Sequence, residues 1–273
     1  MKSSIVIGDS GFIGSAFLEQ IKQRNEKVVG INRHRILIFE DQVTQEFPRQ
    51  SSELAIEIFP FLAEGAVVIN TAWGKNDRGD RDSTIHEEYA KAEVLLIDAL
   101  KNMGCHYISF GSIAEIDDES ISPSRKTAYA EAKKLVTNHL AQSGIKSNWL
   151  RVASLYGPDD RRDWLVPRLL QSLQTGEEVV LENPMQQINL CHIDALVRAT
   201  LTLVEDGIEG VFNVTTDQWL TVSALKKCFT DLTEPEYLSR LSGSFSETDP
   251  VGLQVGTPPL SDFFKAQKQI HKS

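Results

Sequence analysis

Short apolar runs alternate with amphipathic stretches along the first 156 residues of the chain. The β-branched run Ile5–Ile7 breaks at Gly8, and apolar side chains then recur at helical spacing from Phe12 to Lys22, which predicts a strand, a turn and an amphipathic helix. The alternation of strands and helices predicts an α/β fold with a doubly wound parallel sheet. Further strands are expected at Val28–Ile31, Ala66–Ile69, Tyr107–Ser109 and Asn148–Val152, and further helices at Leu54–Leu62, Glu87–Leu100 and Ala128–Ala141.

The pattern changes after residue 156. A run of charged residues, Asp159–Asp163, is followed by an expected helix at Leu165–Leu173 and a short apolar run at Glu178–Leu181. A helix at Ile193–Val204 and a strand at Val211–Val214 then indicate a return to the sheet. We therefore expect two interleaved parts. Residues 1–156 and about 190–216 form a dinucleotide-binding domain, and residues 157–189 and 217–273, with an element at Leu220–Phe229, form a smaller C-terminal substrate-binding lobe.

Composition narrows the class of protein. With 273 residues and 41% hydrophobic side chains, the chain can bury a full core. Its net charge of -10, from 28 basic and 38 acidic residues, disfavours binding to nucleic acid or to an anionic membrane. No apolar stretch reaches bilayer length, and three widely spaced cysteines argue against a disulfide framework. We expect a soluble, cytoplasmic protein with a small-molecule substrate.

The turn after the first strand has the sequence of a phosphate-binding site. Glycines at positions 8, 11 and 14 have the spacing that lets a backbone approach a dinucleotide pyrophosphate at a helix N-terminus. Three glycines alone are weak evidence, because surface turns use glycine freely. Their position between an N-terminal strand and an amphipathic helix strengthens the prediction. The cofactor-binding candidates in this turn are Gly8, Ser10, Gly11, Phe12, Ile13 and Gly14.

The end of the second predicted strand bears on which dinucleotide is bound. Asn32 and Arg33 follow that strand, with His34 and Arg35 after them. An acidic residue at this place would bind the ribose 2′-hydroxyl of NAD, whereas a guanidinium pairs with the 2′-phosphate of NADP. We therefore expect NADP, bound through Asn32 and above all Arg33. If these basic side chains only solvate a loop, NAD remains the alternative.

Tyr129 and Lys133 form a candidate catalytic pair. Among the five tyrosines only Tyr129 has a lysine four residues later, which puts both side chains on one helical face. A phenol has a reference pKa of about 10, and a neighbouring ammonium stabilises its anion, so Tyr129 is a candidate acid or base. Ser112 follows the predicted strand Tyr107–Ser109, at the sheet edge where ligands bind, and could hydrogen-bond the reacting oxygen.

These segments together resemble the extended short-chain dehydrogenases/reductases, a Rossmann-fold group of NAD(P)-dependent nucleotide-sugar epimerases, dehydratases and reductases. The resemblance covers nearly the whole chain. It implies that Tyr129 transfers the proton, that Lys133 holds the nicotinamide ribose and lowers the tyrosine pKa, that Ser112 orients the substrate oxygen, and that Ala72 lies along the cofactor. Homodimers are common in this group. The matching segments are Gly8–Gly14, Asn70–Ala72, Ser112, Tyr129 with Lys133, Leu150–Arg151, Tyr156–Pro158, His192–Asp194 and Phe212–Val214.

The chain departs from the group at several positions. Ile113 and Ala114 stand where dehydratases have an Asp-Glu pair, although Glu115 is close in sequence. Glu88 takes the place of a frequent structural asparagine, which would alter a proton relay behind Lys133. The segment Gln186–Leu190 lacks the arginine that grips the nucleotide diphosphate, and we assign no substitute, although Arg161, Arg162 and Arg168 are available.

Several functions fit these residues. We favour an NADP-dependent reductase that acts on a nucleotide-linked keto sugar of the 4-keto-6-deoxyhexose type, with hydride from the nicotinamide and the proton from Tyr129. The alternative is a nucleotide-sugar epimerase that passes through a transient 4-keto intermediate. A dehydratase and a non-catalytic NAD(P)-binding sensor are further alternatives. We expect no metal site, since His86–Ala90 begins like a zinc helix but lacks the second histidine.

Overall fold

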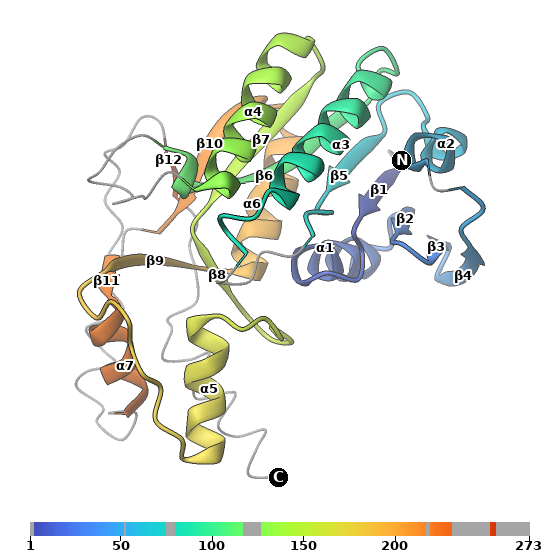
Figure 1. Cartoon of the computed structure of the whole chain (residues 1–273). Helices are drawn as coiled ribbons and strands as arrows, with labels where there is room; N and C mark the ends of the chain where they lie inside the picture. The colour runs from blue at the N-terminus through green and yellow to red at the C-terminus, as the bar shows by residue number, and fades with distance from the viewer. Residues whose placement is uncertain are drawn as a thin grey trace. The chain divides into compact units, whose positions relative to one another are not determined.

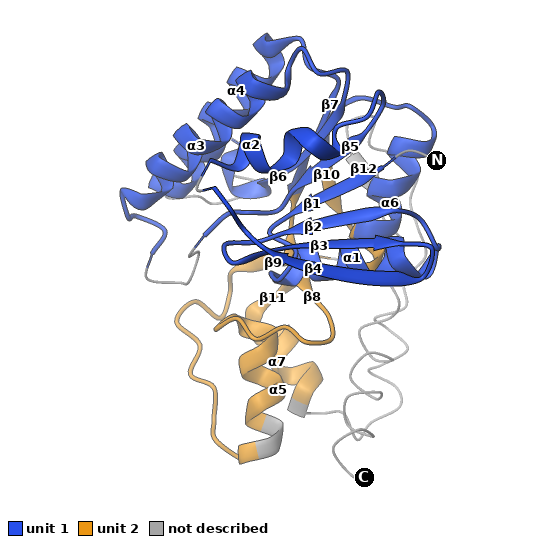
Figure 2. Cartoon of the chain, turned by 90° about the vertical axis from the view of Figure 1, so that its right-hand side faces the viewer, with its two compact units in different colours: residues 1–151, 197–212 blue, residues 152–196, 213–273 orange. Residues whose placement is uncertain are grey.

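The computed structural model describes residues 3–51, 53–74, 80–116, 127–216, 219–230 and 252–254. Two compact units interleave along the chain: residues 1–151 with 197–212, and residues 152–196 with 213–273 (Figure 2). The expected domain and lobe alternate in the same order, but their binding roles stay predictions. Most of the expected lobe segment 217–273 lies outside the described residues.

A largely parallel sheet forms the centre of the first unit. β1 (Ser4–Ile7) pairs in parallel with β2 (Val28–Ile31) and with β5 (Val67–Asn70), and β5 pairs in parallel with β6 (His106–Ser112). The order continues through β7 (Ser147–Val152) and β10 (Gly210–Thr215). Every residue of β1, β2 and β5 is buried, as expected for parallel strands with helices on both faces. The predicted fold class is confirmed.

Helices cover both faces of this sheet. Figures 1 and 2 show α3 (Ile85–Leu100) and α4 (Ala128–Ser143) side by side on one face, and α1 (Phe12–Gln23) and α6 (Ile193–Glu205) on the other. The residues that α3 buries lie along one face of the helix. They are His86, Ala90, Glu93, Leu96, Ile97 and Leu100, so the inner face of this helix brings two ionisable groups into the core.

An antiparallel hairpin extends the sheet beside β2, where no strand is expected from the sequence. β3 (Arg35–Glu40) pairs with β2 and with β4 (Val43–Pro48), in both cases antiparallel. Asp41 and Gln42 have φ values of 50° and 64°, as a two-residue hairpin turn requires. This turn lacks the glycine that usually marks a hairpin in a sequence. β4 is exposed along its whole length, so it also lacks the alternation of apolar and polar residues that marks a half-buried strand.

The helix expected at Leu54–Leu62 is shorter in the structure. α2 spans only Leu54–Ile58, and the 3₁₀ turn η1 (Phe59–Phe61) follows it. Pro60 lies at the start of η1, and its missing N–H removes a bond that an α-helix would need. The expected helices at Glu87–Leu100 and Ala128–Ala141 correspond closely to α3 and α4.

The second unit has its own small sheet and core. β8 (Ser154–Tyr156) pairs in parallel with β9 (Gln187–His192), and β9 pairs antiparallel with β11 (Trp219–Thr221). These strands were not expected, and the run Glu178–Leu181 has no regular structure. β12 (Gly252–Gln254) pairs in parallel with β10. α5 (Leu165–Thr175) and α7 (Val222–Thr230) contribute to a core that includes Tyr156, Val166, Leu169, Leu190, Leu225 and Phe229.

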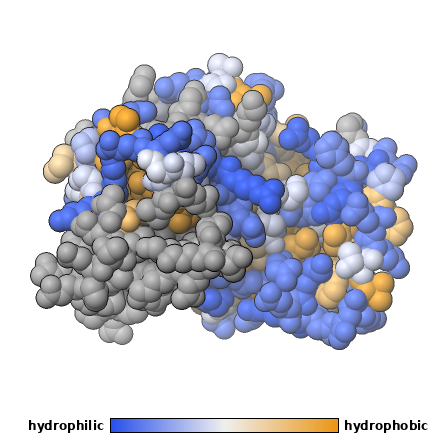
Figure 3. All heavy atoms as spheres, turned by 90° about the horizontal axis from the view of Figure 1, so that it is seen from below, coloured by the Kyte–Doolittle hydropathy of each residue, from blue (hydrophilic) through white to orange (hydrophobic). Residues whose placement is uncertain are grey.

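The described surface seen in Figure 3 is mostly hydrophilic, with scattered apolar residues. α3 and α4 have 16 residues each, fewer than the roughly 20 that a membrane span needs. Within the described ranges, no helix combines the length and hydrophobicity of a membrane-spanning segment.

Candidate active site

The glycine turn packs tightly against the end of β5. Gly8 has a φ of +84°, and a Cβ there would lie 2.8 Å from Thr71 Oγ1 and 2.9 Å from the backbone nitrogen of Ala72. A Cβ on Gly14 would overlap the carbonyl oxygen of Gly8. The Thr71 hydroxyl donates to the carbonyl oxygen of Ile7 over 2.8 Å. Glycine is therefore required at positions 8 and 14, and Ala72 lies directly beside the turn.

The N-terminus of α1 fits a pyrophosphate. Its N-cap is Gly11, with no side-chain capping bond and no acidic residue in the first turn. Backbone N–H groups at such a terminus attract anions. Ser10 and Gly11 are exposed, while Phe12 and Ile13 are half-buried. The predicted turn residues are thus in a position to hold the cofactor, although their binding role stays a prediction.

Asp9 is an unexpected member of this turn. Its side chain is fully buried and points to the end of β2, where Oδ1 accepts from the Asn32 amide over 2.9 Å and Oδ2 lies 3.3 Å from Arg35 Nη1. A Cβ on Gly30 would come within 2.6 Å of this carboxylate. Arg35 also lies 3.6 Å from Glu46. Two carboxylates thus offset the positive charge of Arg35 beside the expected adenosine site.

Asn32 and Arg33, both predicted to bind the cofactor, differ in their surroundings. Asn32 shapes the turn between β2 and β3, because its Oδ1 accepts the backbone N–H groups of His34 and Arg35. The side chain of Arg33 is exposed, and no ion pair ties it to the described residues. Of these two residues, Arg33 is therefore the one with a side chain available to an incoming phosphate.

Tyr129 lies in an aromatic cluster in the first turn of α4. Its ring meets Trp73 edge-on at 6.1 Å and His86 at 5.2 Å between centroids. The Arg81 guanidinium lies 5.7 Å from the centre of the Tyr129 ring. Only 6% of Tyr129 is exposed. The cluster fixes the plane of the phenol, and this role of Trp73 and His86 was not predicted.

His86 holds its own orientation in this cluster by two hydrogen bonds. Trp73 Nε1 donates to His86 Nδ1 over 3.2 Å, and His86 Nε2 lies 2.8 Å from the carbonyl oxygen of Asp80. Burial lowers the pKa of His86, and the charge of Lys133 lowers it further. A neutral ring with its proton on Nε2 satisfies both partners. His86 thus packs against the ring of Tyr129, with both of its own nitrogens engaged in hydrogen bonds.

Lys133 lies one helical turn after Tyr129 and is almost fully buried. Its Nζ donates to the carbonyl oxygen of Phe110 over 2.6 Å and lies 3.4 Å from the centre of the Trp73 ring, which is a close cation–π contact. Burial lowers the pKa of Lys133 to about 8, against the charges of Glu93 and Glu115, which raise it. Lys133 and Tyr129 therefore meet at the same indole ring.

Glu93 on α3 is one of the two carboxylates that act on Lys133. It accepts hydrogen bonds from the hydroxyl groups of Tyr107, over 2.9 Å, and Ser109. Asn70 in turn donates to the Tyr107 hydroxyl over 2.9 Å. Burial and the Glu93 charge raise the pKa of Tyr107 well above its usual value, so Tyr107 stays a donor to the carboxylate. Two hydroxyl groups therefore hold the Glu93 carboxylate in place.

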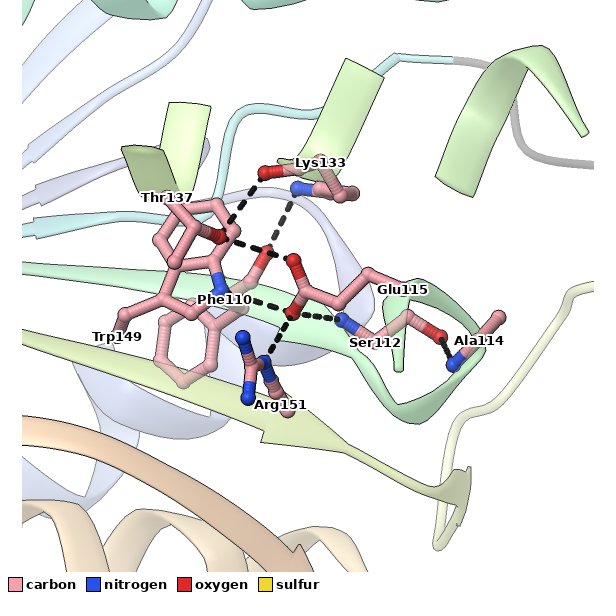
Figure 4. A network of polar contacts seen from close by, with 8 residues as sticks. All are labelled: Phe110, Ser112, Ala114, Glu115, Lys133, Thr137, Trp149 and Arg151. Atoms are coloured by element: carbon pink, nitrogen blue, oxygen red, sulfur yellow. Dashed lines mark hydrogen bonds and ion pairs between the residues drawn. The ribbon is translucent and has the colours of Figure 1, made fainter. Parts of the chain in front are cut away.

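Ser112 ends β6 and caps the 3₁₀ turn η2 (Ile113–Glu115) (Figure 4). Its hydroxyl accepts from the backbone N–H of Ala114 over 3.2 Å, and its own N–H donates to Glu115 Oε1 over 3.3 Å. This reciprocal arrangement is a capping box. Phe110, whose carbonyl binds Lys133, lies two residues before Ser112, so strand β6 links the serine to the lysine.

Glu88 is exposed and pairs with Lys91 over 2.9 Å, so it does not lie behind Lys133; Glu93 does. In the second unit, Arg162 donates to both carboxylate oxygens of Asp160 and to the carbonyl oxygen of Leu155. No group of three His, Cys, Asp or Glu side chains arranged for a metal occurs among the described residues.

Comparison with known proteins places this site in a family. Residues 4–215 match the sequence profile of the "NAD dependent epimerase/dehydratase family". CDP-abequose synthase from Yersinia pseudotuberculosis is 25% identical over 211 residues, 73% of this chain and 72% of that protein. dTDP-4-dehydro-6-deoxy-D-allose reductase from Streptomyces bikiniensis is 23% identical over 265 residues, 83% and 79% of the two chains. UDP-N-acetylglucosamine 4-epimerase from Bacillus cereus shares the fold, with a TM-score of 0.75, 14% identity and coverage of 100% and 97%.

Proposed function

The chain belongs to the NAD dependent epimerase/dehydratase family, and from this premise we propose that it is an NADP-dependent reductase of a nucleotide-linked keto sugar of the 4-keto-6-deoxyhexose type. One observation carries the proposal: Tyr129 and Lys133 of α4 both contact the Trp73 ring. Trp73 follows β5, and Ser112 ends the neighbouring strand β6. Two relatives named for CDP- and dTDP-linked sugars support the substrate class.

Each candidate residue has a distinct task in this reduction. The first turn of α1 and the glycines before it would hold the pyrophosphate. Tyr129 gives its phenolic proton to the carbonyl oxygen of the substrate, and the Lys133 ammonium stabilises the phenolate left behind. Ser112 orients the same oxygen by a hydrogen bond. When bound, the reduced nicotinamide supplies the hydride to the carbonyl carbon, so that the ketone becomes a secondary alcohol and the cofactor is oxidised.

The surroundings of Glu115 favour reduction over dehydration. Elimination of water needs a further acid and base that can exchange protons with the substrate. Glu115 is buried, and its carboxylate accepts from Ser112, Thr137, Trp149 and Arg151. Because four donors engage both carboxylate oxygens and the side chain is shielded from water, Glu115 is not free to contact a substrate, which argues against a rearranged dehydratase role for this residue.

Arg33 supports NADP as the cofactor. Its exposed guanidinium lies at the end of β2, the place at which a 2′-phosphate is recognised. Arg35, by contrast, is already paired with Asp9 and lies near Glu46. The choice between NADP and NAD therefore rests mainly on Arg33.

One assay tests the proposed reaction. Purified protein is mixed with NADPH and a panel of nucleotide-linked 4-keto and hydroxy sugars, and the loss of NADPH absorbance is followed beside product analysis. The supernatant of denatured protein is tested separately for released dinucleotide. We expect stoichiometric NADPH oxidation with a keto sugar and no retained dinucleotide.

The other functions give different results in the same assay. An epimerase would isomerise a hydroxy sugar without net oxidation of NADPH, and the denatured protein would release a dinucleotide. Such a result would contradict the proposed reductase. Loss of water from the sugar would indicate a dehydratase. No turnover with any sugar would support a sensor.

We further infer a cytoplasmic enzyme that acts as a homodimer. None of the three cysteines is in a disulfide, and all are buried, which fits a reducing compartment. Two leucines on neighbouring helices of the first unit, Leu95 on α3 and Leu135 on α4, are 70% and 50% exposed. A second copy of the chain would remove these side chains from water.

A further inference from the structure

Glu115 is a buried carboxylate for which the reaction described above has no step. Its Oε1 accepts from Trp149 Nε1 over 2.8 Å, from Arg151 Nε over 3.0 Å and from the Ser112 N–H over 3.3 Å. Its Oε2 accepts from the Thr137 hydroxyl over 2.9 Å. The four donors come from three elements and converge on one side chain (Figure 4). Trp149 and Arg151 lie on β7, Ser112 ends β6, and Thr137 lies on α4.

The surrounding backbone is built to leave room for this carboxylate. A Cβ on Gly111 would overlap both Glu115 Oε1 and Trp149 Nε1. The side chain of Glu115 is fully shielded from water, and a buried charge is costly unless it is paired and hydrogen-bonded. Arg151 and the neutral donors meet that requirement. Capping of η2 alone would not need a buried charge, since a glutamine could accept the same backbone bond.

Glu115 also acts on Lys133. The Thr137 hydroxyl lies within hydrogen-bond distance of both Glu115 Oε2 and the backbone carbonyl of Lys133, at 2.9 Å and 3.0 Å. The Lys133 ammonium itself binds the carbonyl of Phe110, two residues before Ser112. Both the serine and the lysine of the candidate site are therefore connected to Glu115 through short paths.

The ionisable groups around Lys133 come from every element that packs on it. Glu93 from α3 and Glu115 from η2 carry negative charge and raise the pKa of Lys133. Arg151 from β7 offsets part of the Glu115 charge. His86 and Tyr107 also face this region. Both are neutral at pH 7, since burial lowers the pKa of His86 and raises that of Tyr107.

We propose that Glu115 is a positioning residue of the reduction, which fixes the backbone of Ser112 and holds a negative charge beside the Lys133 ammonium. This inference rests on the proposed function for its catalytic meaning. The effect of Glu115 on the pKa of Lys133 can be measured without any substrate. Glu115 thus couples two candidate residues that lie on different elements.

The decisive variant is Glu115→Gln. The glutamine oxygen can still accept from Ser112, Trp149 and Arg151, and its NH₂ can donate to the Thr137 hydroxyl, so the packing is kept while the charge is lost. Lys133 is titrated directly by NMR of protein with ¹³C-labelled lysine, and its signal is assigned by its loss in Lys133→Met. The wild-type midpoint is expected near 8. It should fall by about one pH unit in Glu115→Gln, the size expected when a nearby opposite charge is removed.

Two controls separate charge from structure. Thr137→Val removes a hydrogen bond to Glu115 but leaves its charge, and it should leave the Lys133 midpoint in place even if the melting temperature falls. Glu88→Gln removes an exposed carboxylate and should change neither. With a keto-sugar substrate, the alkaline limb of the kcat/KM profile should move to lower pH in Glu115→Gln alone, because Lys133 then loses its proton at lower pH.

The possible results are distinct. An unchanged midpoint in folded Glu115→Gln, or an equal shift in Thr137→Val, would overturn the proposal. If Glu115→Gln does not fold, Arg151→Gln decides instead: loss of this cation must raise the Lys133 midpoint, and an unchanged or lower value refutes the coupling. A wild-type protein that reduces no sugar would defeat the proposed function but would leave the lysine titration interpretable.

Discussion

At the scale of single residues, the side chain of Asp9 has an orientation that its place in the glycine turn does not predict. A carboxylate in a phosphate-binding turn would be expected to repel a pyrophosphate. In the structure its side chain points away from the turn toward Asn32 and Arg35, and the glycine at position 30 leaves room for it. Arg35 is thereby partly neutralised, whereas the exposed Arg33 makes no ion pair with the part of the chain that the structure describes.

The cofactor preference depends on that cation. Replacement of Arg33 with glutamine should weaken NADPH binding about tenfold, the size of one lost charge-assisted hydrogen bond, and should leave NADH binding nearly unchanged. Dissociation constants measured by calorimetry for both dinucleotides check this. Arg24→Gln serves as the matched control, since Arg24 pairs with Glu205 elsewhere on the first unit. Equal losses for NADPH and NADH would contradict the role given to Arg33.

The phenolic oxygen of Tyr129 is the second residue-scale test. Tyr129→Phe keeps the ring against Trp73 and His86 but removes the proton donor, so turnover should fall about 100-fold or more while the NADPH dissociation constant stays the same. Tyr89→Phe is the matched control, because its ring belongs to the same aromatic cluster. Undiminished turnover in Tyr129→Phe would refute the mechanism.

At the scale of elements, the start of α4 determines the spacing of the site. The Thr127 side chain accepts from the backbone N–H of Ala130 over 3.2 Å, a cap that fixes the first helical residue at Ala128. Tyr129 then falls in the first turn and Lys133 in the next, both facing the loop after β5. The neighbouring helix α3 supplies His86 and Glu93 to the same region.

The outer faces of α3 and α4 are the surfaces through which we expect the chain to dimerise. We expect Leu95→Glu with Leu135→Glu to weaken dimerisation at least tenfold, because burial of one leucine contributes about 1.5–3 kcal/mol. Sedimentation velocity across a range of protein concentrations measures this. Val180→Glu, at an exposed apolar position of the second unit, is the control. A wild-type protein that stays monomeric at high micromolar concentration would rule out the homodimer.

At the scale of the whole molecule, the two units divide the chain in an interleaved way. The residues that carry the proposed chemistry, from Gly8 to Lys133, all belong to the first unit. The second unit has a separate core and contains the arginines considered for the diphosphate. Arg162 already pairs with Asp160, so we do not assign a substrate contact to Arg162.

Much of the first unit could be predicted from the order of its residues. This holds for the α/β class, for most helices and strands, for the glycine turn and for the pairing of Tyr129 with Lys133. These features depend on local periodicity and on spacing within one turn or one helix, which the order of residues expresses directly. Family membership follows from the same segments. The hairpin β3–β4 escaped prediction because its turn lacks glycine and its outer strand buries nothing.

The surroundings of the candidate residues could not be predicted from the sequence and are known from the folded chain. Trp73, His86, Glu93 and Glu115 are far apart in sequence or carry no motif. They become neighbours of Tyr129, Lys133 and Ser112 because β5 and β6 end, and α3 and α4 begin, at one edge of the sheet. The same holds for the pairing of Asp9 with Arg35. A buried charge can be tolerated only where its partners converge, and that convergence is a property of the fold, since residues distant in sequence supply the partners.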